Sequence, residues 1–132
     1  MDVDKQIAAL QADLNAAHHI TYLTGAGVST PSHIPDYRSK NGIYNGISES
    51  PEQILSEETL FHQPAKFHHF VMENMYFPDA KPNIIHQKIA TSCNKNGTLI
   101  TQNVDGLDKK AGNKHVIGDR IILCVRMNSS LK

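Results

Sequence analysis

A short apolar strand that runs straight into a glycine turn is the feature that most limits how this chain can fold. Residues 20–24 (ITYLT) are mostly β-branched or aromatic, which predicts a short buried strand, and Gly25, Ala26 and Gly27 follow at once. A second strand is predicted over 98–101 (TLIT), again followed by a loop. Helical patterns separate the two strands, and this alternation predicts an α/β fold with a parallel sheet.

Helix signals fill much of the remaining chain. Apolar residues at helical spacing predict a first helix over 3–14. A capping box with proline at the first helical position predicts a helix start at 50–53. Two more helices are predicted from Pro64 and Pro82, the second of them ended by Gly97. A short helix over 106–111 and a third strand over 115–117 complete the pattern, while residues 25–50 are predicted to form a long loop.

The length and charge of the chain exclude several classes of protein. With 132 residues it has room for one domain. Lysine plus arginine and aspartate plus glutamate each number 13, so the net charge is zero, which argues against a nucleic-acid binder. The longest clear apolar run, residues 121–125, is too short to cross a membrane, and the first residues do not resemble a signal peptide. With only two cysteines, we expect a cytoplasmic protein.

The glycine turn after the first strand suits a phosphate group, because backbone N–H groups can approach an anion closely there. It is not a complete dinucleotide fingerprint. Thr30 stands where a third Gly or Ala is needed, and no acidic residue ends a strand about 20 residues further on. An ordinary nicotinamide dehydrogenase is therefore a poor match, and a plain strand-to-loop turn is the alternative for this segment taken alone.

Two further polar segments belong near this turn. In the first, Pro35 stiffens the loop, Arg38 can pair with a phosphate and Tyr37 can cover a ring, although a surface turn is the alternative. The second, residues 101–106, directly follows the second strand. Ligands of open parallel sheets lie beyond the carboxyl ends of the strands, so we expect both loops to line one crevice. An Asx turn that opens a helix is the alternative for Asp105.

Taken together, four segments resemble the sirtuin family. They are GAGVSTPSHIPDYRS from residue 25, GIY from 42, PNIIH from 82 and TQNVDGLDKKAG from 101, in the family's order. The resemblance implies a Rossmann-like parallel sheet with a helical insertion at about 43–80. It also implies an NAD-dependent protein lysine deacylase, which transfers the acyl group of a protein lysine to ADP-ribose and releases nicotinamide.

The resemblance carries the family's cofactor site onto this chain residue by residue. Contacts with NAD fall on Gly25, Ala26, Gly27, Thr30, Tyr37, Arg38, Gln102, Asn103, Val104 and Asp105. Within this set the resemblance places the pocket for the nicotinamide ring and its amide at residues 103–105. Asn103 and Asp105 are the two candidate catalytic residues.

The chain also departs from the family pattern. His33 stands where glycine is usual, which predicts backbone strain if φ is positive there, and Asp108 stands where histidine is usual. Gly118 directly follows Ile117, where the family continues into the segment with its general-base histidine, so that histidine has no match. We therefore expect residues 1–117 to form a partial NAD-binding domain and 118–132 a divergent tail.

These departures lead us to expect an inactive, truncated form of the deacylase. The family's two Cys-x-x-Cys pairs are absent, so we expect no structural zinc. The eight histidines give no other metal site, because no two of them pair at helical spacing. A non-catalytic module that binds NAD or ADP-ribose, and a gene remnant without function, are the alternatives.

Overall fold

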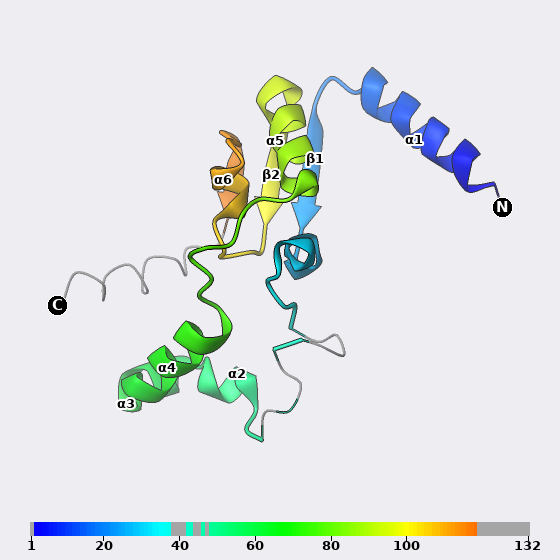
Figure 1. The fold of residues 1–132 in the computed structure, drawn as a ribbon. Helices are drawn as coiled ribbons and strands as arrows, with labels where there is room; N and C mark the ends of the chain where they lie inside the picture. Colours follow the sequence, from blue (N-terminus) through cyan, green and yellow to red (C-terminus); the bar gives the residue numbers. More distant parts are fainter. Residues whose placement is uncertain (1, 38–41, 44–45, 47, 119–132) are drawn as a thin grey trace.

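The computed structural model describes residues 2–37, 42, 43, 46 and 48–118. Arg38 and most of the predicted tail, residues 119–132, lie outside this part of the chain. Figure 1 shows the elements, which follow one another as α1 (Val3–Ala16), β1 (Ile20–Thr24), the 3-10 helix η1 (Ala26–Ser32), α2 (Pro51–Ile54), α3 (Glu57–His62), α4 (Pro64–Asn74), α5 (Ile84–Asn96), β2 (Gly97–Thr101), α6 (Leu107–Lys110) and β3 (Val116–Gly118).

The sheet has three parallel strands in the order β1-β2-β3. Tyr22 of β1 lies opposite Leu99 of β2, and Leu99 lies opposite Val116 of β3. Helix α5 lies along one face of β1 and β2 (Figure 1). These features confirm the α/β fold with a parallel sheet that the sequence predicts.

The core lies between that face of the sheet and α5. Leu99 is fully buried against Ile89 and Cys93 of α5, and Tyr22 and Val116 from the neighbouring strands pack beside them. The Tyr22 hydroxyl also donates a hydrogen bond to Ser92 Oγ (2.8 Å), which ties β1 to the helix. The central strand and α5 therefore hold the sheet in place.

The described residues leave the opposite face of the sheet uncovered. Leu23, Ile100 and Ile117 are direct neighbours across the three strands and are 74%, 40% and 60% exposed. The prediction of a buried strand over 20–24 is therefore only half right, since every second side chain faces outward. The reason is that a helix covers one face alone, whereas parallel sheets are usually covered on both.

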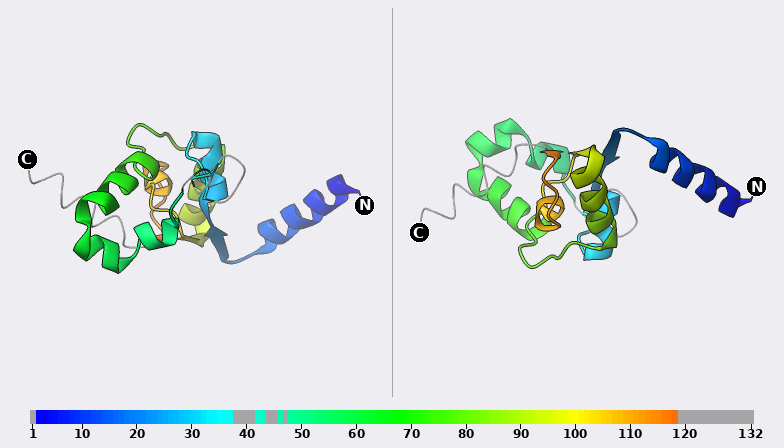
Figure 2. Two further views of the ribbon diagram at one scale, coloured as in Figure 1. Left: turned by 90° about the horizontal axis from the view of Figure 1, so that it is seen from below. Right: turned by 90° about the horizontal axis from the view of Figure 1, so that it is seen from above.

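Helix α1 projects away from the sheet (Figures 1 and 2). None of its residues is buried, and the apolar side chains of Val3, Ile7 and Leu10 are exposed. The helix is where the spacing predicts it, but its apolar stripe is not part of the core. In the part of the chain that the structure describes, no helix is long and apolar enough to cross a membrane.

Helices α2, α3 and α4 lie together, apart from the sheet (Figure 2), within the predicted insertion over 43–80. Pro51 and Pro64 begin α2 and α4, as predicted. The predicted capping box at Ser50 is wrong, because its hydroxyl donates to the Glu52 carboxylate (2.8 Å) instead of accepting a backbone N–H. The sequence pattern does not predict α3, which Ser56 caps. The limits of the insertion remain a prediction.

Candidate functional site

The segment after β1 begins with the 3-10 helix η1 and is not a loop throughout. Side chains three residues apart share one side of a 3-10 helix, so Ala26 and Ser29 both face the crevice beyond the sheet. His33 follows the helix with a φ of 63°, the left-handed conformation, and its N–H donates to the Thr30 carbonyl (3.0 Å). The positive φ that would strain a residue other than glycine is therefore present at His33.

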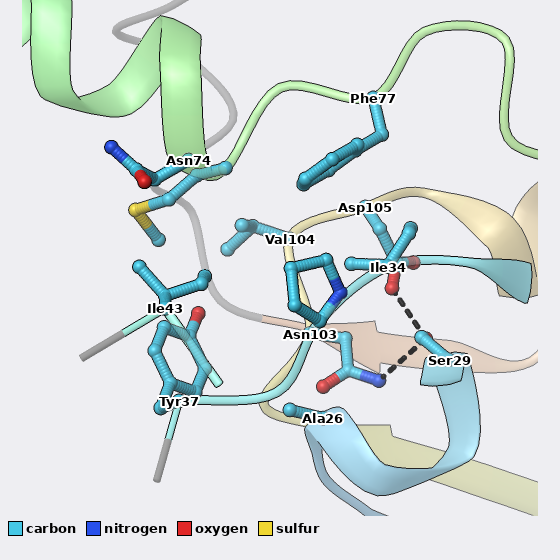
Figure 3. A pocket seen from close by; sticks show the side chains of 12 residues that line it. Ala26, Ser29, Ile34, Tyr37, Ile43, Asn74, Phe77, Asn103, Val104 and Asp105 are labelled. Carbon is cyan, nitrogen blue, oxygen red and sulfur yellow. Dashed lines mark hydrogen bonds between the residues drawn. The ribbon is translucent and has the colours of Figure 1, made fainter. Parts of the chain in front are cut away.

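A pocket opens where η1, the loop after β2 and the end of α4 meet (Figure 3). The empty space there, counted together with its open mouth, is about 350 Å³. Its walls are mainly apolar with a few polar groups, and the lining consists of Ala26, Ser29, Ile34, Pro35, Tyr37, Ile43, Asn74, Met75, Phe77, Asn103, Val104 and Asp105. Such a lining suits a flat ring with a polar substituent.

The carboxylate of Asp105 is held from two sides. Its Oδ1 accepts the Leu107 N–H (2.9 Å), which is the Asx turn that opens α6, and its Oδ2 accepts the Ser29 hydroxyl (2.6 Å). Asp105 therefore both forms the Asx turn and lies at the pocket, because Oδ1 accepts the Leu107 N–H and Oδ2 accepts the Ser29 hydroxyl. Figure 3 shows the bond to Ser29 at the edge of the pocket, where it fixes the orientation of the carboxylate.

Asn103 belongs to the same network. Its Nδ2 donates to the Gly25 carbonyl (3.0 Å) and to Ser29 Oγ (3.3 Å), and its backbone N–H donates to Thr101 Oγ1 (3.1 Å). The Thr24 hydroxyl donates in turn to Thr101 Oγ1 (2.9 Å). The carboxyl ends of β1 and β2 are thereby tied together, and the two polar loops meet in one crevice.

His86 lies behind Ser29 and is almost completely buried. It is the third residue of α5 and completes a capping box there, because the Asn83 N–H donates to His86 Nδ1 (3.2 Å) while the Asn83 side chain accepts the Ile85 N–H (2.9 Å). His86 Nε2 lies 3.4 Å from Ser29 Oγ. Asn83 Nδ2 also donates to the Val28 carbonyl (2.8 Å), so the start of α5 is fastened to η1.

The structure places half of the predicted cofactor residues on the pocket lining, namely Ala26, Tyr37, Asn103, Val104 and Asp105. Four others are not on the lining: Gly25, Gly27, Thr30 and Gln102. Thr30 is exposed and its hydroxyl donates to the Gly27 carbonyl (2.9 Å). Arg38 falls outside the described residues. The contacts of all ten with NAD remain predictions.

The sequence pattern does not indicate several residues of the lining. Asn74, Met75 and Phe77 come from the end of α4 and the segment after it. Their place in the pocket depends on how α4 packs, which the local sequence does not determine. Ser29 does have a local signal. It lies three residues after Ala26, so the two side chains share one side of η1 once this segment is recognised as a 3-10 helix.

A small group of polar side chains is buried beneath the pocket, between α5 and α6. Asp108 is 4% exposed, and its Oδ1 has no hydrogen-bond partner among the residues that the structure describes. Burial raises the pKa of the Asp108 carboxyl, the neighbouring His86 lowers it, and the charge of Asp105 raises it. Burial is also the main cause of a raised pKa of the Cys93 thiol.

One set of metal-ligating side chains occurs within the described residues. A ring nitrogen of His86 and carboxylate oxygens of Asp105 and Asp108 lie within 4.8 Å of one another. A four-cysteine zinc site does not fit this chain, which has two cysteines: Cys93 is buried in the core and Cys124 lies outside the described part.

The parallel sheet, with a pocket beyond the carboxyl ends of its strands, defines a Rossmann-like α/β domain. A sequence profile of the Sir2 family matches residues 25–119. The chain therefore belongs to the Sir2 family, and the resemblance to the sirtuins is confirmed.

Its relatives include bacterial proteins named NAD-dependent protein deacetylase. The one from Listeria innocua is 59% identical over 109 residues, which cover 82% of this chain and 47% of the relative. The one from Staphylococcus aureus is 41% identical over 115 residues, which cover 83% and 47%. The chain thus spans about half the length of the curated relatives it matches.

Solved Sir2 structures share the fold. A Sir2 variant with a deacetylated p53 peptide and 3′-O-acetyl ADP ribose is 37% identical, with a TM-score of 0.75 over 85% of this chain and 46% of the other. A Sir2 complex with a p53 peptide and NAD⁺ is 33% identical, with a TM-score of 0.68 over 89% and 45%.

Proposed function

We propose that this chain holds the nicotinamide end of NAD, as the corresponding part of an NAD-dependent protein deacylase. The observation that carries the proposal is the position of Asn103 and Asp105, which follow β2 directly and reach one edge of a pocket with apolar walls. The names of the relatives and the ligands of the structural neighbours support it.

The pocket fits a carboxamide-bearing ring. Phe77, Ile34 and Val104 offer apolar surface for the ring. Each oxygen of Asp105 already accepts one hydrogen bond, but a carboxylate has about four lone-pair sites, so it can still accept the amide N–H groups of a ligand. When bound, NAD supplies the ribose carbon to which the acyl oxygen of the lysine is transferred.

We expect the substrate to be an acyl-lysine in a protein, as in the deacetylases to which the chain is similar. Nothing in the described pocket selects one acyl group over another. The cytoplasmic location remains a prediction from the sequence.

On its own, the chain is proposed to bind without turnover. No histidine is among the residues that line the described pocket. The nearest one identified behind it, His86, is engaged at both nitrogens, since Nδ1 accepts the Asn83 N–H and Nε2 lies against Ser29. It is therefore not available as a base. Loss of a general base typically slows a reaction by about 10²–10⁴-fold.

Turnover is tested by incubating the purified chain with NAD⁺ and an acetyl-lysine peptide, following nicotinamide and O-acetyl-ADP-ribose by mass spectrometry. We expect neither product above the buffer control. Equal amounts of both products would overturn the proposal of an inactive chain, provided that Asn103→Ala abolishes them. Asn15→Ala on the exposed helix α1 is the matched control for that substitution.

A non-catalytic module for NAD or ADP-ribose is the second candidate. The single observation in its favour is the engagement of His86, which leaves a binding pocket without a base. The two candidates share the pocket and differ only in whether the chain, joined with the rest of a deacylase, contributes to turnover. Addition of a purified polypeptide carrying the other half of a relative separates them, because only the first candidate predicts product.

A further inference from the structure

Asp108 is a buried acid whose carboxyl the proposed function does not use. It belongs to α6, is 4% exposed, and leaves Oδ1 without a hydrogen-bond partner in the described part of the chain. A buried carboxylate without donors is costly, so such a group in a folded chain needs an explanation. Its nearest titratable neighbours are His86 and Cys93 of α5 and Asp105 of the loop before α6.

The proton on the His86 ring can be located from its partners. Nδ1 accepts the Asn83 N–H, so in the neutral ring the proton is on Nε2, which lies 3.4 Å from Ser29 Oγ. The single hydroxyl proton of Ser29 is donated to Asp105 Oδ2 at 2.6 Å. The donors therefore run in one direction, from Asn83 through His86 and Ser29 to the carboxylate at the pocket.

This tautomer argues against a metal at the three clustered groups. A metal needs a ring nitrogen of His86 with a free lone pair, whereas here Nδ1 accepts the Asn83 N–H and Nε2 carries the proton. Binding a metal would move the proton to Nδ1 and break the hydrogen bond from the Asn83 N–H. The closeness of His86, Asp105 and Asp108 is therefore better explained by the hydrogen bonding of His86 than by a bound metal ion.

We propose that Asp108 is a positioning residue for the pocket, which competes with Ser29 for the Nε2–H of His86. The inference rests on the proposed function, because its effect is read at Asp105. When Asp108 is neutral, His86 donates to Ser29, and Ser29 holds Asp105 toward the pocket. When Asp108 is ionised, it draws the same N–H away, and its charge repels that of Asp105 across at most 4.8 Å.

The long separation between His86 Nε2 and Ser29 Oγ fits this competition. At 3.4 Å it is well beyond the usual N–H···O distance, whereas the bond from Ser29 to Asp105 is short at 2.6 Å. Asn113, which lies beyond α6, is also buried. Among the described residues that face this cluster, no lysine or arginine is buried to neutralise Asp108.

The expected pH dependence has a definite sign. Burial and the charge of Asp105 outweigh His86 and raise the pKa of Asp108, so its neutral form persists above the range of an ordinary aspartate. As the pH rises through that pKa, Asp108 ionises and Ser29 loses one of its two donors, His86 Nε2, while Asn103 Nδ2 remains, so nicotinamide binds more weakly. We expect the affinity for nicotinamide to fall by about three- to tenfold across the step, the effect of one weakened hydrogen bond.

The first test follows the His86 ring by NMR in the full chain labelled with ¹⁵N-histidine. In the wild type we expect an unprotonated Nδ1 and an Nε2–H resonance that shifts in one step as Asp108 titrates. Asp108→Asn should remove the step and Asp108→Glu should restore it, while Asp79→Asn, an exposed acid before α5, should leave it unchanged. Protonation of His86 itself is recognised separately, because it adds a proton to Nδ1.

A step that persists in Asp108→Asn, or a wild-type ring with its proton on Nδ1, would overturn the proposal. If Asp108→Asn does not give a dispersed amide spectrum, Asp108→Ala, which cannot ionise and adds no volume to the buried site, replaces it with the same expectation.

The second test measures nicotinamide affinity on both sides of the step. A wild-type affinity that falls with rising pH, and an Asp108→Asn affinity that does not, support the positioning role. Equal wild-type affinities on both sides overturn it. The NMR step can depend on Asp108 while nicotinamide binds at neither pH. In that case Asp108 does compete with Ser29 for the Nε2–H of His86, but the proposed nicotinamide pocket is wrong. The failure of one proposal is thus distinguished from the failure of the other.

Discussion

His33 carries the clearest local strain in the described chain. Its φ of 63° costs a residue with a Cβ about 1–2 kcal/mol, and glycine avoids most of this cost. We therefore expect His33→Gly to stabilise the chain by up to about 1 kcal/mol after the greater freedom of glycine in the unfolded state is counted. The midpoint of urea unfolding, followed by far-UV circular dichroism, measures the change. His33→Ala keeps the Cβ and should give no gain; an equal gain from both substitutions would contradict the role of φ.

Asp108 should make the stability of the fold depend on pH. The pKa of this carboxyl is raised above its ordinary 3.8, so the folded chain binds the proton more tightly than the unfolded chain. The free energy of unfolding therefore falls as the pH rises from about 3.8 through the raised pKa and stays low above it. Asp108→Asn should flatten this slope and add on the order of 1 kcal/mol at pH 7.

Urea unfolding between pH 4 and pH 8 checks this expectation, with Asp79→Asn as the exposed control. A slope that is equally steep in Asp108→Asn would show that another group is responsible.

Single residues show how far sequence reasoning reaches at this scale. Asn103 and Asp105 can be assigned to the crevice because they closely follow the carboxyl end of a strand, but Gln102 follows the same strand and is not on the pocket lining. Thr30 lies on the side of the 3-10 helix η1 that faces away from the pocket. Nothing about a threonine in the sequence reveals that position. The buried place of Asp108 depends on the contact between α5 and α6, and an aspartate in a predicted helix start is ordinarily expected at the surface.

Among the elements, α5 depends most on one side chain at its first turn. Asn83 accepts the Ile85 N–H as a cap and donates through Nδ2 to the Val28 carbonyl and to Ser32 Oγ (2.9 Å). Asn83→Ala should lose both functions, whereas Asn83→Asp keeps the cap and loses the two donors. We expect the alanine variant to cost about 0.5–2 kcal/mol for the cap alone.

Amide hydrogen exchange at the first turn of α5 and along η1 separates these effects. Asn83→Asp should increase exchange mainly in η1, and Asn83→Ala should increase it in both elements. Unchanged exchange in η1 for either variant would contradict the tie between the two helices.

Helices whose ends carry a proline or glycine could be predicted from the sequence, and elements with weaker signals at their ends could not. Pro51 and Pro64 mark helix starts, because the proline ring fixes φ whatever surrounds it. Gly97 marks the end of α5, where a Cβ would collide with the Ile20 carbonyl oxygen. Helix α3 has six residues, fewer than the roughly 11–18 over which helical periodicity can be recognised. Gly25 precedes the 3-10 helix η1, and Gly27 and Pro31 lie within it, so the sequence predicts a loop there.

For the whole molecule, the main consequence of the fold is the uncovered apolar row formed by Leu23, Ile100 and Ile117. An apolar face of this kind binds hydrophobic dyes and promotes association. We expect the wild-type chain to bind 1-anilinonaphthalene-8-sulfonate strongly. Replacing the three residues by threonine, which keeps the preference for a strand, should reduce dye binding several-fold.

Fluorescence of the dye and light scattering at rising chain concentration measure this effect. Leu99→Ala, which alters the buried face instead, should increase dye binding by opening the core. Dye binding that does not change in the triple threonine variant would place the exposed apolar surface elsewhere, with α1 the next surface to test.

At this scale the order of the strands and the covered face could be predicted only in outline. Alternating strands and helices predict a parallel sheet, but they do not say which face α5 covers. Helix α1 shows the same limit, because an apolar stripe predicts a buried face and here remains exposed. The spacing of apolar residues within one helix does not show which other element packs against it.

The most direct test of the nicotinamide pocket is saturation-transfer NMR on NAD⁺ mixed with the purified chain. We predict that the nicotinamide ring protons receive the strongest saturation, and that Asp105→Ala removes it while the matched Asp13→Ala on α1 does not. Strongest saturation on the adenine protons, or saturation of the nicotinamide ring that survives Asp105→Ala, would contradict the assignment of this pocket.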